Sequence, residues 1–138
     1  MTATLQALLG FIAWTLCLLV LMEAIRSWLV LSGTVPANGF TPDNANLSPF
    51  MQRLARAHAN CLEGLPLFGG LMLVAVVAVV AGRATVTDPL AWVLLGARIV
   101  QSLIHLVSTS PAAVTARFTA FAVQVAIAVY WVFGLSAA

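Results

Sequence analysis

Long runs of hydrophobic residues divide the chain into four stretches, near residues 5–31, 49–81, 88–108 and 112–134. Each is longer than the roughly 20 residues that an α-helix needs to cross the hydrocarbon core of a bilayer. Transmembrane β-strands would be about 10 residues long and would alternate between apolar and polar positions, a pattern not seen here. The pattern therefore predicts an all-α, polytopic membrane protein, a single domain built as a bundle of four transmembrane helices.

The segments between these stretches carry residues that end and begin helices. The longest, 32–48, is rich in Gly, Pro, Asn and Asp, and Ser48-Pro49 forms an N-cap followed by proline at the first helical position. Pro89 and Pro111 stand at the start of the third and fourth stretches. Because the connections are short, neighbouring helices should be antiparallel.

Composition supports a membrane location. Of the 138 residues, 62% are hydrophobic and only 7% are charged, and the mean hydropathy is +1.06. A soluble domain of this composition would have too few polar residues to cover its surface. Cys17 and Cys61 lie within predicted helices, where we interpret them as packing residues. No spacing of Cys and His resembles a zinc or haem site, and we expect neither a metal nor a nucleic-acid partner.

The arginines predict the orientation of the helices. Arg26, Arg53, Arg56 and Arg117 fall at the face that carries the first and third loops, whereas Arg83 alone falls at the opposite face. Cytoplasmic loops of membrane proteins carry an excess of positive charge. We therefore expect the first and third loops in the cytoplasm and both termini outside.

The second stretch contains a polar stripe. Arg53, Arg56, Asn60 and Glu63 fall within an arc of roughly 80° on a helix. Charged residues in or near hydrocarbon usually have partners or a function. A positively charged, partly dehydrated pocket near the cytoplasmic interface would suit an anionic ligand with several carboxylates. The alternative is that Arg53 and Arg56 only extend to the lipid headgroups.

The third stretch presents a matching face. Arg98, Gln101, Ser102 and His105 fall within an arc of about 100°. Arg98 lies roughly 15 Å from either end of its helix, so it should have an acidic partner. We expect Glu63 and Arg98 to interact directly or through a shared ligand, and a purely structural pair is the alternative. His105 is either a base or ligand, or a hydrogen-bonded packing residue.

Residues 56–68 read Arg-Ala-His-Ala-Asn-Cys-Leu-Glu-Gly-Leu-Pro-Leu-Phe. This segment resembles the signature of the MAPEG superfamily, the membrane-associated proteins in eicosanoid and glutathione metabolism, with its pattern Arg-Ala-x-x-Asn-x-x-Glu-x-x-Pro. The leukotriene C4 synthase branch is particularly similar through Asn-Cys-x-Glu-x-x-Pro-Leu-Phe. The chain resembles a bacterial-type member of this superfamily, which would lie in the inner membrane. The resemblance also implies a homotrimer. Its glutathione sites would lie between adjacent subunits and open toward the cytoplasm.

The resemblance also implies roles for individual residues. Arg117 is the candidate for the arginine that activates the thiol, and Arg26 is the counterpart of a first-helix arginine that reaches the site of the neighbouring subunit. Arg98 matches the third-helix arginine that meets the glutamate of the signature. The glutathione-binding set implied in this way is Arg26, Arg53, Arg56, Asn60, Glu63, Arg98, Gln101 and His105.

The activity implied is that of a microsomal glutathione transferase or peroxidase acting on lipophilic electrophiles or lipid hydroperoxides from the bilayer. The chain departs from the family at Gly64, Gln101 and His105, where related enzymes often carry tyrosines, and Tyr130 is its only tyrosine. A non-catalytic MAPEG-like protein that binds lipid or a partner is therefore an alternative. A small pore-forming or holin-like protein is a second alternative, although such a protein needs no stripe of arginine and glutamate.

Overall fold

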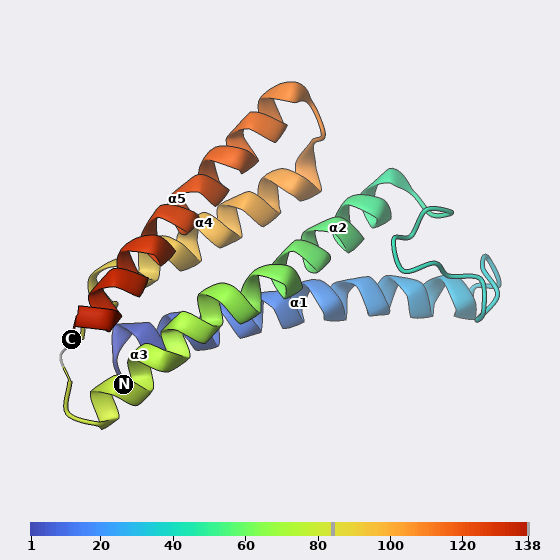
Figure 1. Ribbon diagram of the computed structural model, residues 1–138. Helices are drawn as coiled ribbons and strands as arrows, with labels where there is room; N and C mark the ends of the chain where they lie inside the picture. Colours follow the sequence, from blue (N-terminus) through green and yellow to red (C-terminus); the bar gives the residue numbers. More distant parts are fainter. Residues whose placement is uncertain (84, 138) are drawn as a thin grey trace.

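The computed structural model describes residues 1–83 and 85–137, most of which are helical (Figure 1). The described residues form no strand, and their helices are α1 (Ala3–Leu31), α2 (Pro49–Gly64), the π-helix η1 (Leu65–Gly69), α3 (Gly70–Val80), α4 (Asp88–Val107) and α5 (Pro111–Ala137). Because α2, η1 and α3 are continuous, the chain has four helical spans, each long and apolar enough to cross a membrane. The predicted all-α class and the four spans are confirmed.

Consecutive spans run antiparallel (Figure 1). Both termini and the connection from α3 to α4 lie at one end, and the 32–48 loop and the turn between α4 and α5 lie at the other. The α4 helix packs against α1 and α2, and α5 packs mainly on α4. Toward the loop end, α4 and α5 diverge from α2, so the two helical hairpins form a V.

The helices begin at the predicted signals. The hydroxyl of Ser48 accepts a hydrogen bond from the amide of Met51 at 3.3 Å, and Pro49 occupies the first helical position. At the N-terminus, the hydroxyl of Thr2 accepts a hydrogen bond from the amide of Leu5 at 3.2 Å. Such side chains satisfy amides that have no partner within the helix.

One carboxylate joins the N-terminal ends of α1 and α4. Asp88 accepts hydrogen bonds from the amide of Thr4 at 2.8 Å and from its hydroxyl at 2.5 Å. The hydroxyls of Thr4 and Thr87 also lie 2.6 Å apart. A negative charge at a helix N-terminus is favourable because the free amides there carry partial positive charge. This cluster fixes the closed end of the V.

The second span widens into a π-helix at Pro66, a feature that the sequence analysis did not predict. Proline has no amide hydrogen, and its ring would collide with the carbonyl of Leu62 in a regular α-helix. The wider turn over Leu65–Gly69 accommodates the ring without breaking the span. Segments of this kind are frequent at functional sites, and this one lies directly beside the site described below.

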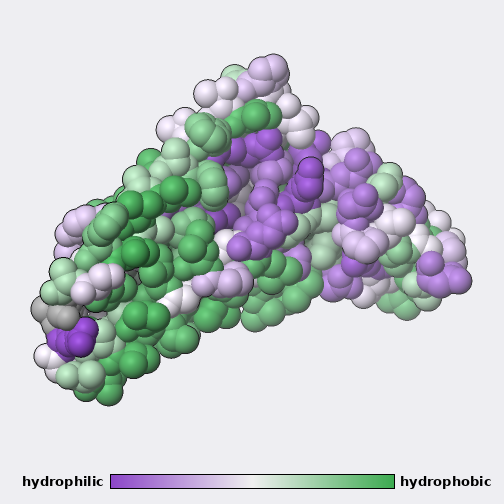
Figure 2. Space-filling view, in the orientation of Figure 1, coloured by the Kyte–Doolittle hydropathy of each residue, from purple (hydrophilic) through white to green (hydrophobic). Residues whose placement is uncertain are grey.

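The helices pack around a small hydrophobic core and leave other apolar side chains outside. Phe11, Leu54, Phe68, Leu94 and Trp131 are completely buried. Figure 2 shows hydrophobic surface over α3 and the C-terminal part of α5, and hydrophilic surface gathered between α2 and the α4–α5 hairpin. Large exposed apolar patches mark membrane or protein contacts, and the exposed side chains here include Leu16, Val77, Phe133 and Val129.

Candidate functional site

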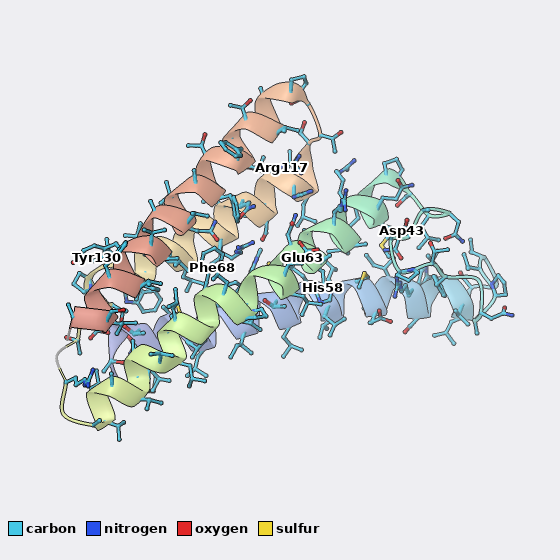
Figure 3. All side chains as sticks on the ribbon, in the orientation of Figure 1. Asp43, His58, Glu63, Phe68, Arg117 and Tyr130 are labelled. Atoms are coloured by element: carbon cyan, nitrogen blue, oxygen red, sulfur yellow. The ribbon has the colours of Figure 1, made fainter. Side chains whose placement is uncertain are left out.

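A cavity of about 390 Å³ lies in the V, between α2 and η1 on one side and α4 and α5 on the other. Its polar lining comes from α2, α4 and the start of α5, and its apolar lining comes from η1 and α5. Figure 3 shows Glu63 and Arg117 on facing helices across this space. The cavity is lined by Asn60, Glu63, Gly64, Leu67, Phe68, Arg98, Gln101, His105, Val114, Arg117, Phe118 and Phe121.

Arg98 forms the buried floor of the cavity. Its side chain is only 2% exposed, and its guanidinium carbon lies 5.3 Å from the ring centre of both Phe11 and Phe68. Its Nη1 donates a hydrogen bond to the backbone oxygen of Asn60 at 3.2 Å, whereas its buried Nε has no partner. A cation held between two aromatic rings gains about 0.5–2 kcal/mol per ring.

Arg98 and Glu63 line the same cavity but form no ion pair in the described chain. The direct ion pair that we expected from their similar depth is therefore absent. An interaction through a shared ligand stays a prediction. The reason lies at Gly64, where a Cβ atom would stand 2.5 Å from Nη2 of Arg98. Because this position has no side chain, the guanidinium lies against the backbone of α2, where it bonds to the Asn60 carbonyl.

Two further α4 side chains of the cavity, those of Gln101 and His105, contact side-chain amides of neighbouring helices. Nε2 of Gln124 donates a hydrogen bond to Oε1 of Gln101 at 2.9 Å, and Gln124 is completely buried. Nδ2 of Asn60 lies 3.4 Å from Nδ1 of His105, and an amide nitrogen in this contact can only donate. This contact is a hydrogen bond in the tautomer of His105 that carries its proton on Nε2.

A second cavity of about 400 Å³ continues from the first toward the loop end and shares His105 and Arg117 with it. Arg53 and Arg56 line this second cavity. Arg53 is partly engaged, because its Nε donates a hydrogen bond to the backbone oxygen of Leu106 at 2.8 Å. The two cavities together bring four arginines and one glutamate to one continuous space.

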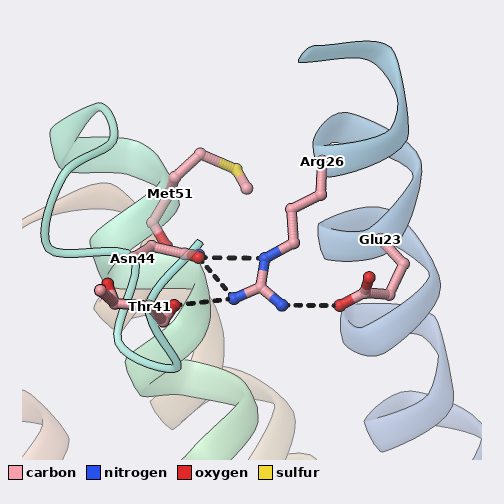
Figure 4. A network of polar contacts seen from close by, with 5 residues as sticks. All are labelled: Glu23, Arg26, Thr41, Asn44 and Met51. Atoms are coloured by element: carbon pink, nitrogen blue, oxygen red, sulfur yellow. Dashed lines mark hydrogen bonds and ion pairs between the residues drawn. The ribbon is translucent and has the colours of Figure 1, made fainter. Parts of the chain in front are cut away.

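Arg26 stands apart from both cavities. It donates hydrogen bonds to Oδ1 of Asn44 from Nε at 3.1 Å and from Nη2 at 2.6 Å (Figure 4). It also pairs with Glu23 at 2.9 Å and donates to the backbone oxygen of Thr41 at 3.2 Å. The Asn44 side chain in turn donates to the backbone oxygen of Met51 at 2.8 Å. Within one chain, Arg26 therefore holds the 32–48 loop against α1 and the start of α2.

The α5 side of the cavity is apolar and open at its edge. Phe118 is 68% exposed and Leu67 is 54% exposed, so the two side chains flank an opening between η1 and α5. Behind them, the rings of Phe68 and Phe121 meet edge to face with centres 6.5 Å apart. A molecule dissolved in the bilayer can meet this wall while a charged molecule contacts the arginines.

The structure brings together eight of the nine residues that the sequence analysis selected, all except Arg26. Sequence reasoning missed Phe11, Phe68 and Gln124. The aromatic rings carry no signal of their own, because they follow the hydrophobic pattern of any buried helix face. Gln124 had a signal in the sequence, since it follows Arg117 by one heptad on the same face of the helix. The structure buries this amide completely.

Comparison with known proteins identifies the family. No curated protein and no solved structure gives a match to this chain. The model of the MAPEG family matches residues 4–137, which cover all four helical spans and both walls of the cavity. The chain therefore belongs to the MAPEG family and is an integral, multi-pass membrane protein.

Proposed function

We propose that this protein is a glutathione-dependent transferase or peroxidase that acts on lipophilic electrophiles or lipid hydroperoxides. The observation that carries this proposal is the two-sided cavity in the V. One side presents arginines and a glutamate, and the other presents aromatic and aliphatic side chains that reach the lipid-facing surface. A water-soluble thiol and an apolar second substrate thus have separate walls within one space.

The charges match those of glutathione, which carries carboxylates at both ends, an ammonium group at one end and a thiol between them. Arg56 and Arg98 are suited to the carboxylates, because a guanidinium binds a carboxylate through parallel charge-assisted hydrogen bonds. The Glu63 carboxylate, which has no ion pair in the described chain, is suited to the ammonium group. Asn60, Gln101 and His105 add neutral polar contacts along the same wall.

Arg117 is the candidate for activating the thiol. It lines both cavities and makes no hydrogen bond or ion pair with the described residues, so its guanidinium is available to a ligand. A free thiol has a pKa near 8.5 and is largely protonated at neutral pH. Lowering that pKa by about 2 units requires roughly 2.7 kcal/mol of preferential stabilisation of the thiolate. One guanidinium bonded to sulfur in a dry pocket is sufficient for this.

We also propose a homotrimer with its glutathione sites between adjacent subunits. Arg26 of one subunit would approach the site of the next subunit near the end of the V that carries the loops. In the proposed orientation this end faces the cytoplasm and the termini face outside, in a bacterial inner membrane. The clustering of Arg26, Arg53, Arg56 and Arg117 toward that end supports this orientation.

A non-catalytic lipid- or partner-binding protein is the second candidate. The observation that favours it is the absence of a phenol from the residues that line the cavity. Tyr130, the only tyrosine, lies on α5 far from Glu63 and Arg117 and is 56% exposed (Figure 3). Its hydroxyl cannot reach a thiol held in the cavity.

Calorimetric titration of glutathione into the protein in lipid nanodiscs, followed by turnover with cumene hydroperoxide, distinguishes the two functions. The enzyme proposal predicts both binding and turnover, and it predicts that Glu63→Gln weakens binding. Arg83→Ala serves as a control, because Arg83 lies in the connection between α3 and α4 at the opposite end of the molecule. Binding without turnover of any electrophile favours the non-catalytic function, and absence of binding contradicts the glutathione site itself.

A further inference from the structure

A third cavity, of about 460 Å³, lies between the 32–48 loop and α2. Figure 3 shows Asp43 on this loop, beside the first turns of α2. Small apolar side chains and a few polar ones line the cavity, which is bounded by Pro42, Asp43, Ala45, Gln52, Ala55, Arg56 and Ala59. Apart from Arg56, none of these residues belongs to the proposed glutathione site.

The loop side of this third cavity is held in place by bonds to two helices. Asn44, the residue after Asp43, is completely buried and accepts two hydrogen bonds from Arg26 of α1 (Figure 4). On the α2 side, Nε2 of Gln52 donates a hydrogen bond to the backbone oxygen of Leu47 at 3.0 Å. The Arg26 network, which stands apart from the glutathione cavities, therefore builds the wall that carries Asp43.

The third cavity carries one charge of each sign. Asp43 belongs to the loop and Arg56 to α2, and the two side chains form no ion pair in the described chain. The neighbouring Thr41 hydroxyl and Ala45 amide lower the pKa of Asp43, so its carboxylate is charged at neutral pH. Arg56 makes no hydrogen bond or ion pair with the described residues. Opposite charges on two walls of one cavity are complementary to a zwitterion.

The length of the second span places this cavity at the level of the lipid headgroups. The span runs from Pro49 to Val80, and its uninterrupted apolar part begins only at Leu65. Arg56 lies roughly 36 Å along the helix from Val80, at about 1.5 Å per residue. The hydrocarbon core of a bilayer is about 30 Å thick. Arg56 and the loop beside it therefore lie beyond the hydrocarbon, where phosphates and ammonium groups of lipids are found.

We propose that the third cavity binds the headgroup of a zwitterionic phospholipid that carries a primary ammonium group, with its phosphate on Arg56 and its ammonium on Asp43. A guanidinium donates parallel hydrogen bonds to a phosphate, and an ammonium group donates to a carboxylate. A trimethylammonium headgroup has no N–H to donate, and a glycerol headgroup has no positive charge. The cavity should therefore select ethanolamine among these headgroups.

This inference is independent of the proposed glutathione function, although Arg56 also lines the second cavity. A guanidinium presents five N–H donors in a planar fork, so it can bind one anion on each of two edges. A headgroup in the third cavity and a carboxylate in the second cavity can thus contact the same side chain.

Native mass spectrometry in mild detergent tests the role of Asp43 through the affinity of the first bound lipid. Dioleoyl phosphatidylethanolamine should bind about twofold to fivefold more tightly than the choline and glycerol lipids with the same chains, the value of an exposed charge pair. Asp43→Asn should remove this preference, while its amide oxygen can still accept the hydrogen bond from the Ala45 amide that shapes the loop. Glu63→Gln is the matched control, because it removes the same charge from a different cavity.

The role of Arg56 is tested with all three lipids, since all three carry a phosphate. Arg56→Gln should weaken each of them by a similar factor of about two to five. Arg53→Gln is the matched control, because Arg53 precedes Arg56 by three residues on α2 but does not line the third cavity. Ala59→Leu should also weaken all three lipids without a change of charge, because its larger side chain fills part of the third cavity.

Four results would overturn the inference. The unmodified protein could bind the three lipids equally, or Asp43→Asn could weaken the ethanolamine and choline lipids alike. Soluble O-phosphoethanolamine that binds as tightly as the lipid would assign the cavity to a soluble zwitterion. Ala59→Leu that dissociates an oligomer and leaves lipid binding intact would assign the cavity to a second copy of the chain. None of these measurements uses glutathione, so they stand or fall separately from the proposed function.

Discussion

The guanidinium of Arg98 lies against the backbone of Gly64, in the space that a side chain at that position would occupy. The same guanidinium is held between Phe11 and Phe68 and hydrogen bonds to the backbone oxygen of Asn60. A glycine one residue after Glu63 thus determines where the deepest positive charge of the cavity lies. This relationship links the residue that follows Glu63 to the geometry of the site.

Gly64→Ala should displace Arg98 toward the cavity and the Glu63 carboxylate. The contact at 2.5 Å cannot be kept once a Cβ atom is present. We expect glutathione binding to weaken by roughly threefold to tenfold, as for the loss of one hydrogen bond. Alanine stabilises a helix by about 0.5–1 kcal/mol relative to glycine, so thermal stability should change little.

Gly96→Ala is the matched control for this change. A Cβ atom at Gly96 would meet nothing within 4 Å, and this glycine also lies within a membrane span. Titration calorimetry should therefore give the unmodified affinity for Gly96→Ala. Equal affinities for both glycine variants would contradict the role assigned to Gly64.

Arg98→Met should raise the thermal stability of the ligand-free protein while abolishing the stabilisation that glutathione confers. A buried charge without a counter-charge carries a desolvation cost of several kcal/mol, and two contacts with aromatic rings return only about 0.5–2 kcal/mol each. Methionine fills similar volume at no electrostatic cost. Thermal unfolding in detergent, with and without glutathione, measures both effects. A fall in the ligand-free melting temperature would show that Arg98 has a counter-charge, for example in a neighbouring subunit.

Thr4→Val should destabilise the protein by about 1–3 kcal/mol, because it removes the hydroxyl that bonds both Thr87 and Asp88 at the junction of α1 and α4 and leaves only the backbone amide of residue 4 on Asp88. Thr119→Val offers the same chemical change on a hydroxyl that bonds only within its own helix. Denaturation of the two variants side by side should separate them clearly. The same stability for both would mean that the cluster does not hold the closed end of the V.

The hydrophobic pattern was sufficient for the four spans, because helix length and apolar composition are local properties of the sequence. The polar stripes on α2 and α4 likewise predicted most of the cavity, since residues three or four positions apart share one face of a helix. The position of Arg98 was not predictable in this way. It depends on two aromatic rings from other helices and on the space above Gly64, and neither is visible in a periodic pattern.

The π-helix shows a second limit of pattern reading. Pro66 was visible within the second stretch, yet a proline in a long helix predicts a kink, a break or a wider turn equally well. The structure has the wider turn, which keeps the span continuous over Leu65–Gly69. Arg26 shows a third limit, because the predicted role toward a neighbouring subunit depends on an assembly, whereas its bonds within the chain are to Glu23 and to the 32–48 loop.

We propose above all that the cavity binds glutathione and that Arg117 converts its thiol to a thiolate. The most direct measurement is the ultraviolet difference spectrum of glutathione with the protein at neutral pH, in which a bound thiolate has its own absorption. We expect this absorption for the unmodified protein and for Arg83→Ala. Arg117→Ala should lose it while calorimetry still detects bound glutathione, and Arg56→Ala should weaken binding itself. Saturating glutathione that gives no thiolate absorption with the unmodified protein would contradict the claim.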